Sequence, residues 1–318
     1  MMVATSPDTS ANHDGATPAL PGTYGAAPDG FRLPAGTQVG SVVLQVSDLA
    51  RSLVFYEQVL GMERVSGDAT SAQLSAQDST RVLVELRERR GAKPAPITGR
   101  LGLYHFAILL PDRASLGRFV RHLSEVGARA GSGDHLVSEA YYLNDPDGMA
   151  IEVCADRPRE MWRRKGRELM MATDPVDVRS VLAAAGDTPW TGMPAGAVVG
   201  HVHLHVGDID LAWAFYGEGM GFDKMVWQYP GALFFGADGY HHHLGTNTWA
   251  GSHASAAAED EARLIEWTVE LPSADAIDAL TASLVRGGYA AERDAQSVVT
   301  RDPWDTQVRA RLSDIRAG

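Results

Sequence analysis

Alternating apolar and polar positions mark several strands in this 318-residue chain. The stretch 199–206 has apolar residues at its even positions after Gly200 and histidines at three odd positions, His201, His203 and His205. Side chains alternate between the two faces of a strand, so this stretch predicts a strand with one apolar and one polar face. An Asp at a helix start and an amphipathic helix that ends at Gly follow it.

The same strand and helix pattern recurs along the chain at fixed spacing. Residues 39–48 match residues 199–208, and residues 105–111 match residues 266–272. The offsets of about 160 positions continue through the helices that follow each strand, which is evidence of internal repetition. We therefore predict four modules, each a strand, a helix and several further strands, that start near residues 39, 103, 199 and 264.

The modules divide the chain into two main segments. Residues 1–38 are rich in Ala, Pro, Gly, Thr and Asp, lack the pattern of a secretory signal, and are predicted to be a disordered tail. Residues 39–158 hold modules 1 and 2, and residues 198–314 hold modules 3 and 4. Residues 159–197 between them are charged and then Gly/Pro-rich, which predicts a surface connector with a short helix at residues 177–185.

Composition narrows the function classes. The formal net charge of −12 argues against nucleic acid or an anionic membrane as the main partner. No apolar run approaches the roughly 20 residues that a membrane helix needs. The single cysteine, Cys154, excludes an intramolecular disulfide and fits a reducing compartment. We therefore expect a soluble cytoplasmic protein with neither a nucleic-acid nor a membrane partner.

Four βαβββ modules of this kind resemble the vicinal oxygen chelate superfamily, which contains glyoxalases and extradiol dioxygenases. Residues 102–113, 133–148 and 239–249 resemble stretches of two-domain extradiol ring-cleaving enzymes, most closely the bacterial catechol 2,3-dioxygenases. The resemblance covers the chain after the tail. It implies an α+β fold in which the four modules form two eight-stranded, cup-like domains.

The resemblance also implies metal ligands at fixed module positions. One His comes from the first strand of each paired module, and a carboxylate comes from the last strand of one of them. Modules 1 and 4 carry Ser41 and Glu266 at the first-strand position, and neither residue supplies an imidazole. Modules 2 and 3 supply His105, Glu152 and His201. The metal cup is therefore predicted to pair modules 2 and 3, which leaves modules 1 and 4 as a metal-free cup.

Two histidines and one carboxylate with open positions suit Fe(II) and oxygen chemistry. Mn(II) fits the same ligands, and ligand type alone does not exclude zinc. The expected cofactor is Fe(II), with Mn(II) as the alternative, and the expected partners are a small aromatic diol and O₂. The sequence carries no signal of oligomeric state, although relatives are often oligomers.

The run from Gly133 to Glu152 resembles the extradiol signature, in which Gly-x-His precedes a Tyr, an Asp-Pro-x-Gly turn and the Glu ligand. One residue departs from it, because Tyr141 stands where an aliphatic residue is usual. The resemblance implies that His135 and Tyr142 line the substrate site and donate hydrogen bonds to catecholate oxygens and to an oxygen-derived intermediate. The residues alone leave open a surface histidine and a packed strand tyrosine.

A second cluster, the consecutive histidines His241, His242 and His243, is assigned to the last strand of module 3. Because Leu244 sets the apolar face, strict alternation places His242 on that face and the other two in the cup. The resemblance implies an acid–base histidine on this strand, and the unperturbed pKa of histidine near neutrality suits that role. We expect it to be His241 or His243.

These patterns favour an Fe(II)-dependent extradiol dioxygenase that cleaves catechol or a substituted catechol with O₂ to a 2-hydroxymuconic semialdehyde-type product. One alternative keeps the fold but runs another metal-dependent reaction, as an isomerase, lyase or transferase. The other is a metal-free protein that sequesters a small aromatic molecule, against which the retained ligands of modules 2 and 3 argue. Fold-level resemblance does not fix the ring substituent.

Overall fold

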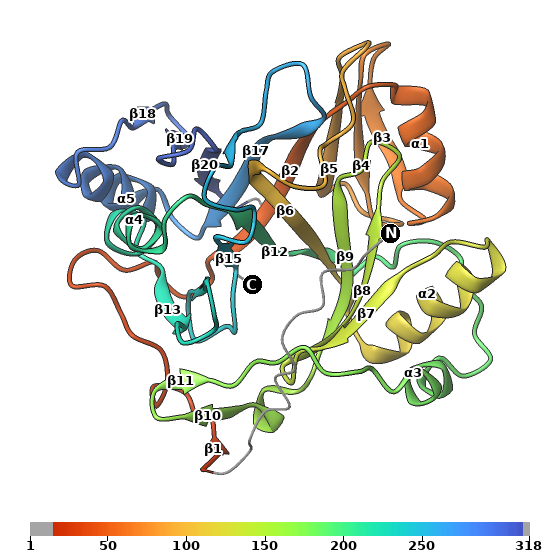
Figure 1. The fold of residues 1–318 in the computed structure, drawn as a ribbon, viewed down its shortest axis with the longest axis horizontal. Helices are drawn as coiled ribbons and strands as arrows, with labels where there is room; N and C mark the ends of the chain where they lie inside the picture. Colours follow the sequence, from red (N-terminus) through yellow and green to blue (C-terminus); the bar gives the residue numbers. More distant parts are fainter. Residues whose placement is uncertain (1–14, 314–318) are drawn as a thin grey trace.

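The computed structural model describes residues 15–313 and contains the four predicted modules (Figure 1). Module 1 comprises β2 (Gln38–Val46), α1 (Leu49–Gln58), β3 (Glu63–Gly67), β4 (Ser71–Ser75) and β5 (Val82–Glu88). Module 2 comprises β6 (Arg100–Leu109), α2 (Arg113–Glu125), β7 (Gly131–Asp134), β8 (Ser138–Asn144) and β9 (Ala150–Asp156).

The second half repeats this order with one irregular helix. Module 3 comprises β12 (Val198–His205), α4 (Ile209–Ala212), its π-helical continuation η2 (Trp213–Gly219), β13 (Asp223–Val226), β14 (Ala232–Gly236) and β15 (Leu244–Asn247). A short strand, β16 (Ser255–Ala256), precedes module 4, which comprises β17 (Arg263–Leu271), α5 (Ala274–Arg286), β18 (Glu292–Arg293), β19 (Ser297–Arg301) and β20 (Gln307–Leu312).

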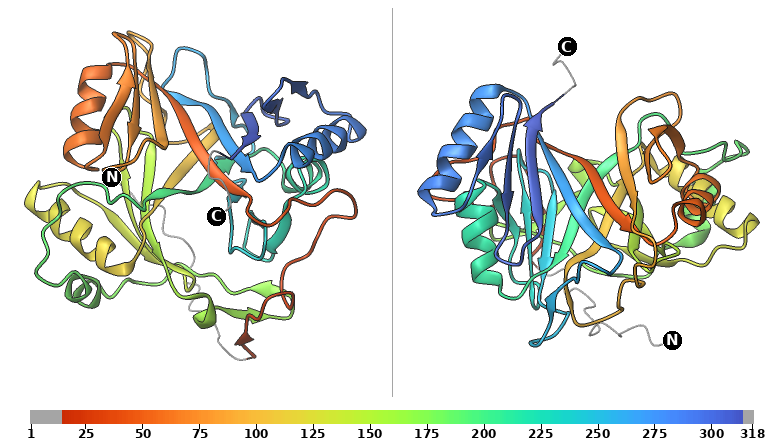
Figure 2. Two further views of the ribbon diagram at one scale, coloured as in Figure 1. Left: turned by 180° about the vertical axis from the view of Figure 1, so that it is seen from behind. Right: turned by 90° about the horizontal axis from the view of Figure 1, so that it is seen from above.

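The strands form two large mixed sheets that combine the modules across the two halves of the chain. One sheet has the order β13-β14-β15-β12-β6-β9-β8-β7, with β16 also paired to β6, and so contains modules 2 and 3. The other has the order β18-β19-β20-β17-β2-β5-β4-β3 and contains modules 1 and 4. The helices lie on the outer sides of the sheets (Figure 2). The predicted α+β fold with two cup-like domains is confirmed.

The repeated helix starts have a clear local cause. The Asp48 carboxylate accepts a hydrogen bond from the Arg51 N–H, and the Asp208 carboxylate accepts one from the Leu211 N–H. These N-caps satisfy donors that have no partner within the helix, so both helices begin where the sequence predicts. None of the helices among residues 15–313 has the length and apolar character that a membrane span requires.

The expectation of a disordered tail is wrong for residues 15–37. A short strand there, β1 (Thr17–Pro18), pairs with the connector, and Leu33 is buried in the main core. The Tyr24 hydroxyl donates a 2.7 Å hydrogen bond to the Gly239 carbonyl. The composition suggested disorder, but a few apolar and aromatic side chains are enough to hold the segment against the surface of the folded modules. Residues 1–14 of the predicted tail and the predicted boundary at 314 lie outside the described residues.

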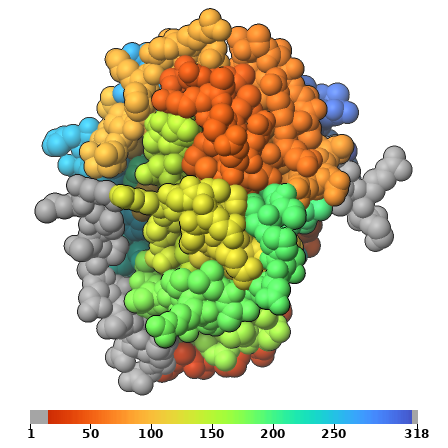
Figure 3. All heavy atoms as spheres, turned by 90° about the vertical axis from the view of Figure 1, so that its right-hand side faces the viewer, coloured from red at the N-terminus to blue at the C-terminus, as the bar shows by residue number. Residues whose placement is uncertain are grey.

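The connector contains the predicted helix, here α3 (Val178–Ala184), which is confirmed. It also contains the 3₁₀ turn η1 (Arg159–Met161) and the strands β10 (Arg163–Lys165) and β11 (Glu168–Leu169). The helix packs on α2 at Gly117, where a Cβ atom would lie 2.3 Å from the Val181 carbonyl oxygen. Figure 3 shows this green segment beside the yellow α2. A side chain at Gly117 would therefore displace α3 of the connector from α2 of module 2.

Alternation within the central strands separates the core from the cup. On β6, Phe106 and Ile108 are fully buried in the apolar cluster that runs through both sheets. On β9, Ile151 and Val153 enter the same cluster. The intervening positions therefore point to the opposite face of the sheet, where the polar residues of the candidate site lie.

Candidate metal centre

Three neighbouring strands in the middle of one sheet each contribute one buried polar side chain to a single point. His201 lies on β12, His105 on β6 and Glu152 on β9. The Nε2 atoms of the two histidines are 3.3 Å apart. Glu152 Oε2 lies 3.1 Å from the Nε2 of His105 and 3.3 Å from that of His201. Strand order and alternation together assemble this cluster.

The three residues fit a divalent metal ion. Ligand atoms about 2.1 Å from a metal and at right angles to one another are about 3.0 Å apart, close to the separations found here. The second carboxylate oxygen, Glu152 Oε1, is buried without a hydrogen-bond partner among the described residues. Buried polar atoms are normally satisfied, so an unpartnered carboxylate oxygen in this cluster fits a site that binds a cation. This is the one group of potential ligands with such geometry within residues 15–313.

The electrostatics of the cluster keep its ligand atoms in metal-binding form. Burial by itself would raise the pKa of the Glu152 carboxyl, but His201 and His105 hold it well below its usual value. Burial lowers the pKa of His105, so the imidazole is neutral at pH 7. A carboxylate and a neutral imidazole each offer a lone pair to a cation.

A cavity of about 380 Å³ opens beside the cluster. Its walls are largely apolar and aromatic and include Tyr104, Met171, Tyr229, Phe234 and Trp249. None of the described residues that line it is Lys or Arg. Concave, mostly apolar sites with a few placed polar groups are typical of small-molecule binding sites.

His135 and Tyr142 lie together on one wall of this cavity. Their side chains meet at 2.5 Å between His135 Nε2 and the Tyr142 hydroxyl. The other ring nitrogen, His135 Nδ1, lies 2.7 Å from the Ala172 carbonyl oxygen, which can only accept a hydrogen bond. His135 Nδ1 therefore carries the proton, and Tyr142 donates its hydroxyl proton to Nε2. Burial raises the pKa of Tyr142 well above its usual value, which keeps that proton in place.

Two further histidines of β12 are held by one amide. Asn247 Nδ2 donates to His203 Nε2 at 3.0 Å, and Asn247 Oδ1 accepts from His205 Nδ1 at 2.6 Å. The backbone N–H of Trp249 donates to the same oxygen at 3.0 Å, which fixes the orientation of the amide. His203 lines the cavity, so this hydrogen-bond network fixes the orientation of one side chain in the cavity wall.

Known proteins provide an independent comparison. Residues 38–153 match the profile of the Glyoxalase/Bleomycin resistance protein/Dioxygenase superfamily. The catechol-2,3-dioxygenase of Bacillus subtilis (strain 168) is 43% identical over 270 residues, which cover 84% of this chain and 94% of that protein. The chain belongs to this superfamily. The resemblance inferred from the sequence motifs is confirmed.

Solved structures show the same fold at low sequence identity. A crystal structure from Bacillus subtilis subsp. subtilis str. 168 has a TM-score of 0.62 and 10% identity, covering 90% of this chain and 87% of the other. Glyoxalase I from Zea mays has a TM-score of 0.52 and 17% identity, covering 87% and 92%. At these identities, the matches to superfamily structures establish the fold alone.

The three consecutive histidines of this superfamily member are oriented differently from the sequence prediction. His242 lines the cavity, and its ring centroid is 4.1 Å from that of His201. His241 instead contacts Asp156, and His243 lines a separate cavity of about 310 Å³. The prediction that His242 lies on the apolar face is wrong, because His242 lines this cavity, and His241 and His243 are not among its described lining residues.

The cause of this error is local backbone geometry. Residues 240–243 form a bend that precedes β15, which begins only at Leu244, so strand alternation does not extend back to them. The Ala237 N–H donates to His243 Nδ1 at 3.2 Å, which holds that ring away from the cup. The triple histidine marked a segment that reaches the cavity, but it did not identify which ring lines it.

Proposed function

We propose that this protein is an extradiol dioxygenase that uses O₂ to cleave catechol or a substituted catechol next to the diol, giving a 2-hydroxymuconic semialdehyde-type product. The observation that carries the proposal is the close approach of His105, Glu152 and His201, whose ligand atoms lie 3.1–3.3 Å apart beside an aromatic-walled cavity. The 43% identity to a catechol-2,3-dioxygenase supports it. We place the reaction in the cytoplasm, in line with a single buried cysteine, Cys154.

The proposed metal ligands are His105, Glu152 and His201, with Fe(II) as the cofactor and Mn(II) as the alternative. Two histidines and a carboxylate on one face leave coordination positions free. When bound, such a metal supplies Lewis-acid and electron-transfer chemistry that brings a catecholate and O₂ to react. The protein contributes the ligand geometry and a pocket with largely apolar walls.

His242 is the proposed acid–base residue, in place of His241 or His243. It is buried and lines the cavity next to His201. Burial lowers the pKa of His242 well below its usual value, so its imidazole is neutral at pH 7. A neutral imidazole can accept the proton of a catechol hydroxyl and later return it.

Tyr142 and His135 are the proposed orienting pair in the cavity wall. Because Tyr142 keeps its proton, its hydroxyl can turn from His135 Nε2 and donate to a substrate oxygen that enters the cavity. Its partner His135 is fixed by the Ala172 carbonyl of the connector. Pre-oriented donors stabilise charge that develops on substrate oxygens.

The pocket favours an uncharged catechol. The described lining residues contain a carboxylate, Glu152, but no Lys or Arg. A carboxylate on the substrate ring would therefore be buried without a cationic partner, which is costly. Tyr104, Phe234 and Trp249 provide aromatic surfaces for the ring.

Oxygen uptake tests the proposal. The protein would be loaded anaerobically with Fe(II), mixed with catechol in air-saturated buffer, and monitored for oxygen loss and a yellow product. We expect both with the wild type and neither with His105→Ala, whereas His253→Ala, at an exposed histidine, retains activity. Bound iron without uptake of any simple catechol would favour another metal-dependent reaction. A failure to bind metal at all would favour the sequestering protein.

A further inference from the structure

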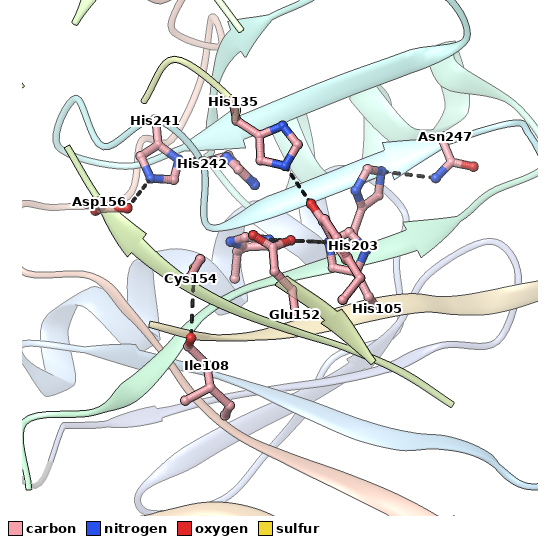
Figure 4. A network of polar contacts seen from close by, with 12 residues as sticks. His105, Ile108, His135, Glu152, Cys154, Asp156, His203, His241, His242 and Asn247 are labelled. Atoms are coloured by element: carbon pink, nitrogen blue, oxygen red, sulfur yellow. Dashed lines mark hydrogen bonds and ion pairs between the residues drawn. The ribbon is translucent and has the colours of Figure 1, made fainter. Parts of the chain in front are cut away.

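A chain of hydrogen bonds leads away from the cavity through two histidines to a carboxylate. His242 Nδ1 lies 2.7 Å from His241 Nδ1. His241 Nε2 lies 2.9 Å from Asp156 Oδ1. His242 lines the cavity, whereas His241 is not among its described lining residues. Figure 4 shows His241 joined to Asp156. His241 and Asp156 are thus linked to the cavity through His242.

The order of donors in this chain follows from chemistry. An ionised carboxylate can only accept hydrogen bonds, so His241 Nε2 must carry the proton that lies toward Asp156. In a neutral His241 the Nδ1 is then bare and can only accept. His242 must therefore donate from its own Nδ1, and the Nε2 of a neutral His242 is left without a proton.

Asp156 is suited to fix this order because it remains ionised. Burial by itself would raise the pKa of Asp156, but the hydrogen bond from His241 Nε2 helps to hold it below the usual value, which a neutral imidazole can do. The carboxylate stands on β9 four residues after Glu152, and alternation puts both side chains on the same face of the strand. One strand thus carries a metal-binding carboxylate and a second carboxylate that reaches the histidine pair.

Packing holds His241, the middle residue of this hydrogen-bonded series, in place. His241 is 1% exposed. Its ring centroid lies 4.1 Å from that of Tyr240 and 5.3 Å from that of Trp162. A ring enclosed in this way cannot turn over without moving its neighbours, so Nε2 keeps facing Asp156 and Nδ1 keeps facing His242.

We infer that Asp156 and His241 hold His242 in the tautomer whose bare Nε2 is available to the substrate. Both are then positioning residues for the proposed ring cleavage, and this role rests on the proposed function. In the step concerned, the O–H bond of a catechol hydroxyl breaks, its electron pair stays on oxygen, and a new N–H bond forms at His242 Nε2. The resulting imidazolium keeps its Nδ1 hydrogen bond to His241, whose own proton points to Asp156.

Ring-nitrogen NMR on the metal-free protein tests the predicted tautomer of His242 without relying on turnover. In protein labelled with ¹⁵N-histidine, the His242 signals are identified by their loss in His242→Gln. We expect a protonated Nδ1 and a bare Nε2 in the wild type. His241→Phe keeps a ring of similar size but removes the acceptor, so His242 should change to the opposite tautomer. A protonated Nε2 in the wild type, or an unchanged His242 in His241→Phe, would overturn the inference.

Kinetics of the iron-loaded protein give the second readout. Asp156→Asn should lower kcat by about 10- to 100-fold, as is typical for partners of active-site histidines, and change the KM for catechol much less. Asp156→Glu, which restores a carboxylate, should recover part of the loss. The matched control is Asp238→Asn, an exposed carboxylate just before the histidines, which should keep the wild-type kcat. Equal kcat values for Asp156→Asn and Asp238→Asn would contradict the positioning role.

The two readouts separate the inference from the function on which it rests. A wild-type protein that cleaves no catechol would overturn the proposed function. The ring-nitrogen spectra would still decide whether Asp156 and His241 set the tautomer of His242.

Discussion

A single carboxylate, Glu152, links the two histidines of the candidate metal centre. It is buried, and one of its oxygens has no partner among the described residues. We expect Glu152→Gln to weaken Fe(II) binding by more than about 100-fold, because even residues behind the ligands contribute 10- to 100-fold. Anaerobic titration with a chromophoric chelator measures this. Glu160→Gln, at an exposed glutamate, is the control, and equal affinities in the two variants would remove Glu152 from the site.

The absence of basic residues from the described cavity lining leads to a prediction about substrate charge. We expect kcat/KM for a carboxylated catechol to lie at least about 100-fold below that for catechol, since an unpaired buried carboxylate costs several kcal/mol. Thr173, on the cavity wall, offers a place to supply the missing cation. Thr173→Arg should narrow the gap between the two substrates. A wild type that prefers the carboxylated ring would contradict this description of the pocket.

At the scale of elements, buried polar contacts join the two modules within each half of the chain. The Tyr56 hydroxyl on α1 lies 3.4 Å from Asp145 at the β8–β9 turn, and Tyr216 in module 3 donates to Asp302 in module 4 at 2.8 Å. Backbone N–H groups of Asp147 and Met149 also donate to Asp145. Despite these bonds, burial raises the pKa of Asp145 to about 6.

This raised pKa predicts a pH dependence of stability. The folded state holds the proton of Asp145 more tightly than the unfolded state, so the group favours folding most at low pH and loses that effect as the pH rises through about 6. This loss lowers the free energy of unfolding by about 3 kcal/mol. Asp145→Asn removes this pH-dependent contribution. The free energy of unfolding of the variant, relative to that of wild type, should therefore be higher at pH 7 than at pH 4. Urea unfolding at both pH values measures the difference.

The control for that experiment is Asp29→Asn, at an exposed aspartate. Its difference from wild type should be nearly the same at both pH values. If Asp145→Asn shows an equally flat difference, Asp145 titrates in the folded protein as it does in the unfolded chain.

The elements were predictable where a physical rule acts within a few residues. The helix starts followed from Asp48 and Asp208 because an N-cap needs only its own first turn. The face of β12 that carries His201 followed from alternation in the same way. The orientation of His242 did not, because residues 240–243 bend and their rings are placed by Asp156 and Ala237 from elsewhere in the fold.

At the scale of the whole molecule, the two sheets use the same plan for different purposes. In the sheet of modules 1 and 4, Glu266 and Arg309 occupy places that correspond to metal ligands and form a two-pronged ion pair, with N···O distances of 2.9 and 3.0 Å. An arginine always carries its positive charge and offers no lone pair to a metal. The residues at these places were readable from the repeat, whereas their direct pairing required the structure.

The packing of the N-terminal segment could not be predicted from its composition. Its composition predicted disorder, yet Tyr24 is 8% exposed and packs in a cluster with Trp162 and Met225. Its hydroxyl also reaches the Gly239 carbonyl, two residues before His241. Composition could not reveal this because the surface that receives the segment exists only once the modules have folded.

This packing predicts that the segment stabilises the protein. Tyr24→Ala should lower the free energy of unfolding by about 3 kcal/mol, as expected for the loss of a buried aromatic ring. It should also lower kcat, since the bend that carries His242 loses its hydrogen bond from Tyr24. Leu20→Ala, at a residue that is 61% exposed in the same segment, should change the stability little. Equal stabilities of the two variants, measured by urea unfolding, would show that the contact is not stabilising.

The most direct measurement for the whole account is the fate of the oxygen atoms. The iron-loaded protein would turn over catechol under ¹⁸O₂, and the product would be trapped at once and identified by mass spectrometry. We expect a ring-opened semialdehyde, cleaved beside the diol, that contains both heavy oxygen atoms. A product cleaved between the two hydroxyl carbons, or a product that contains one heavy oxygen or none, would contradict it.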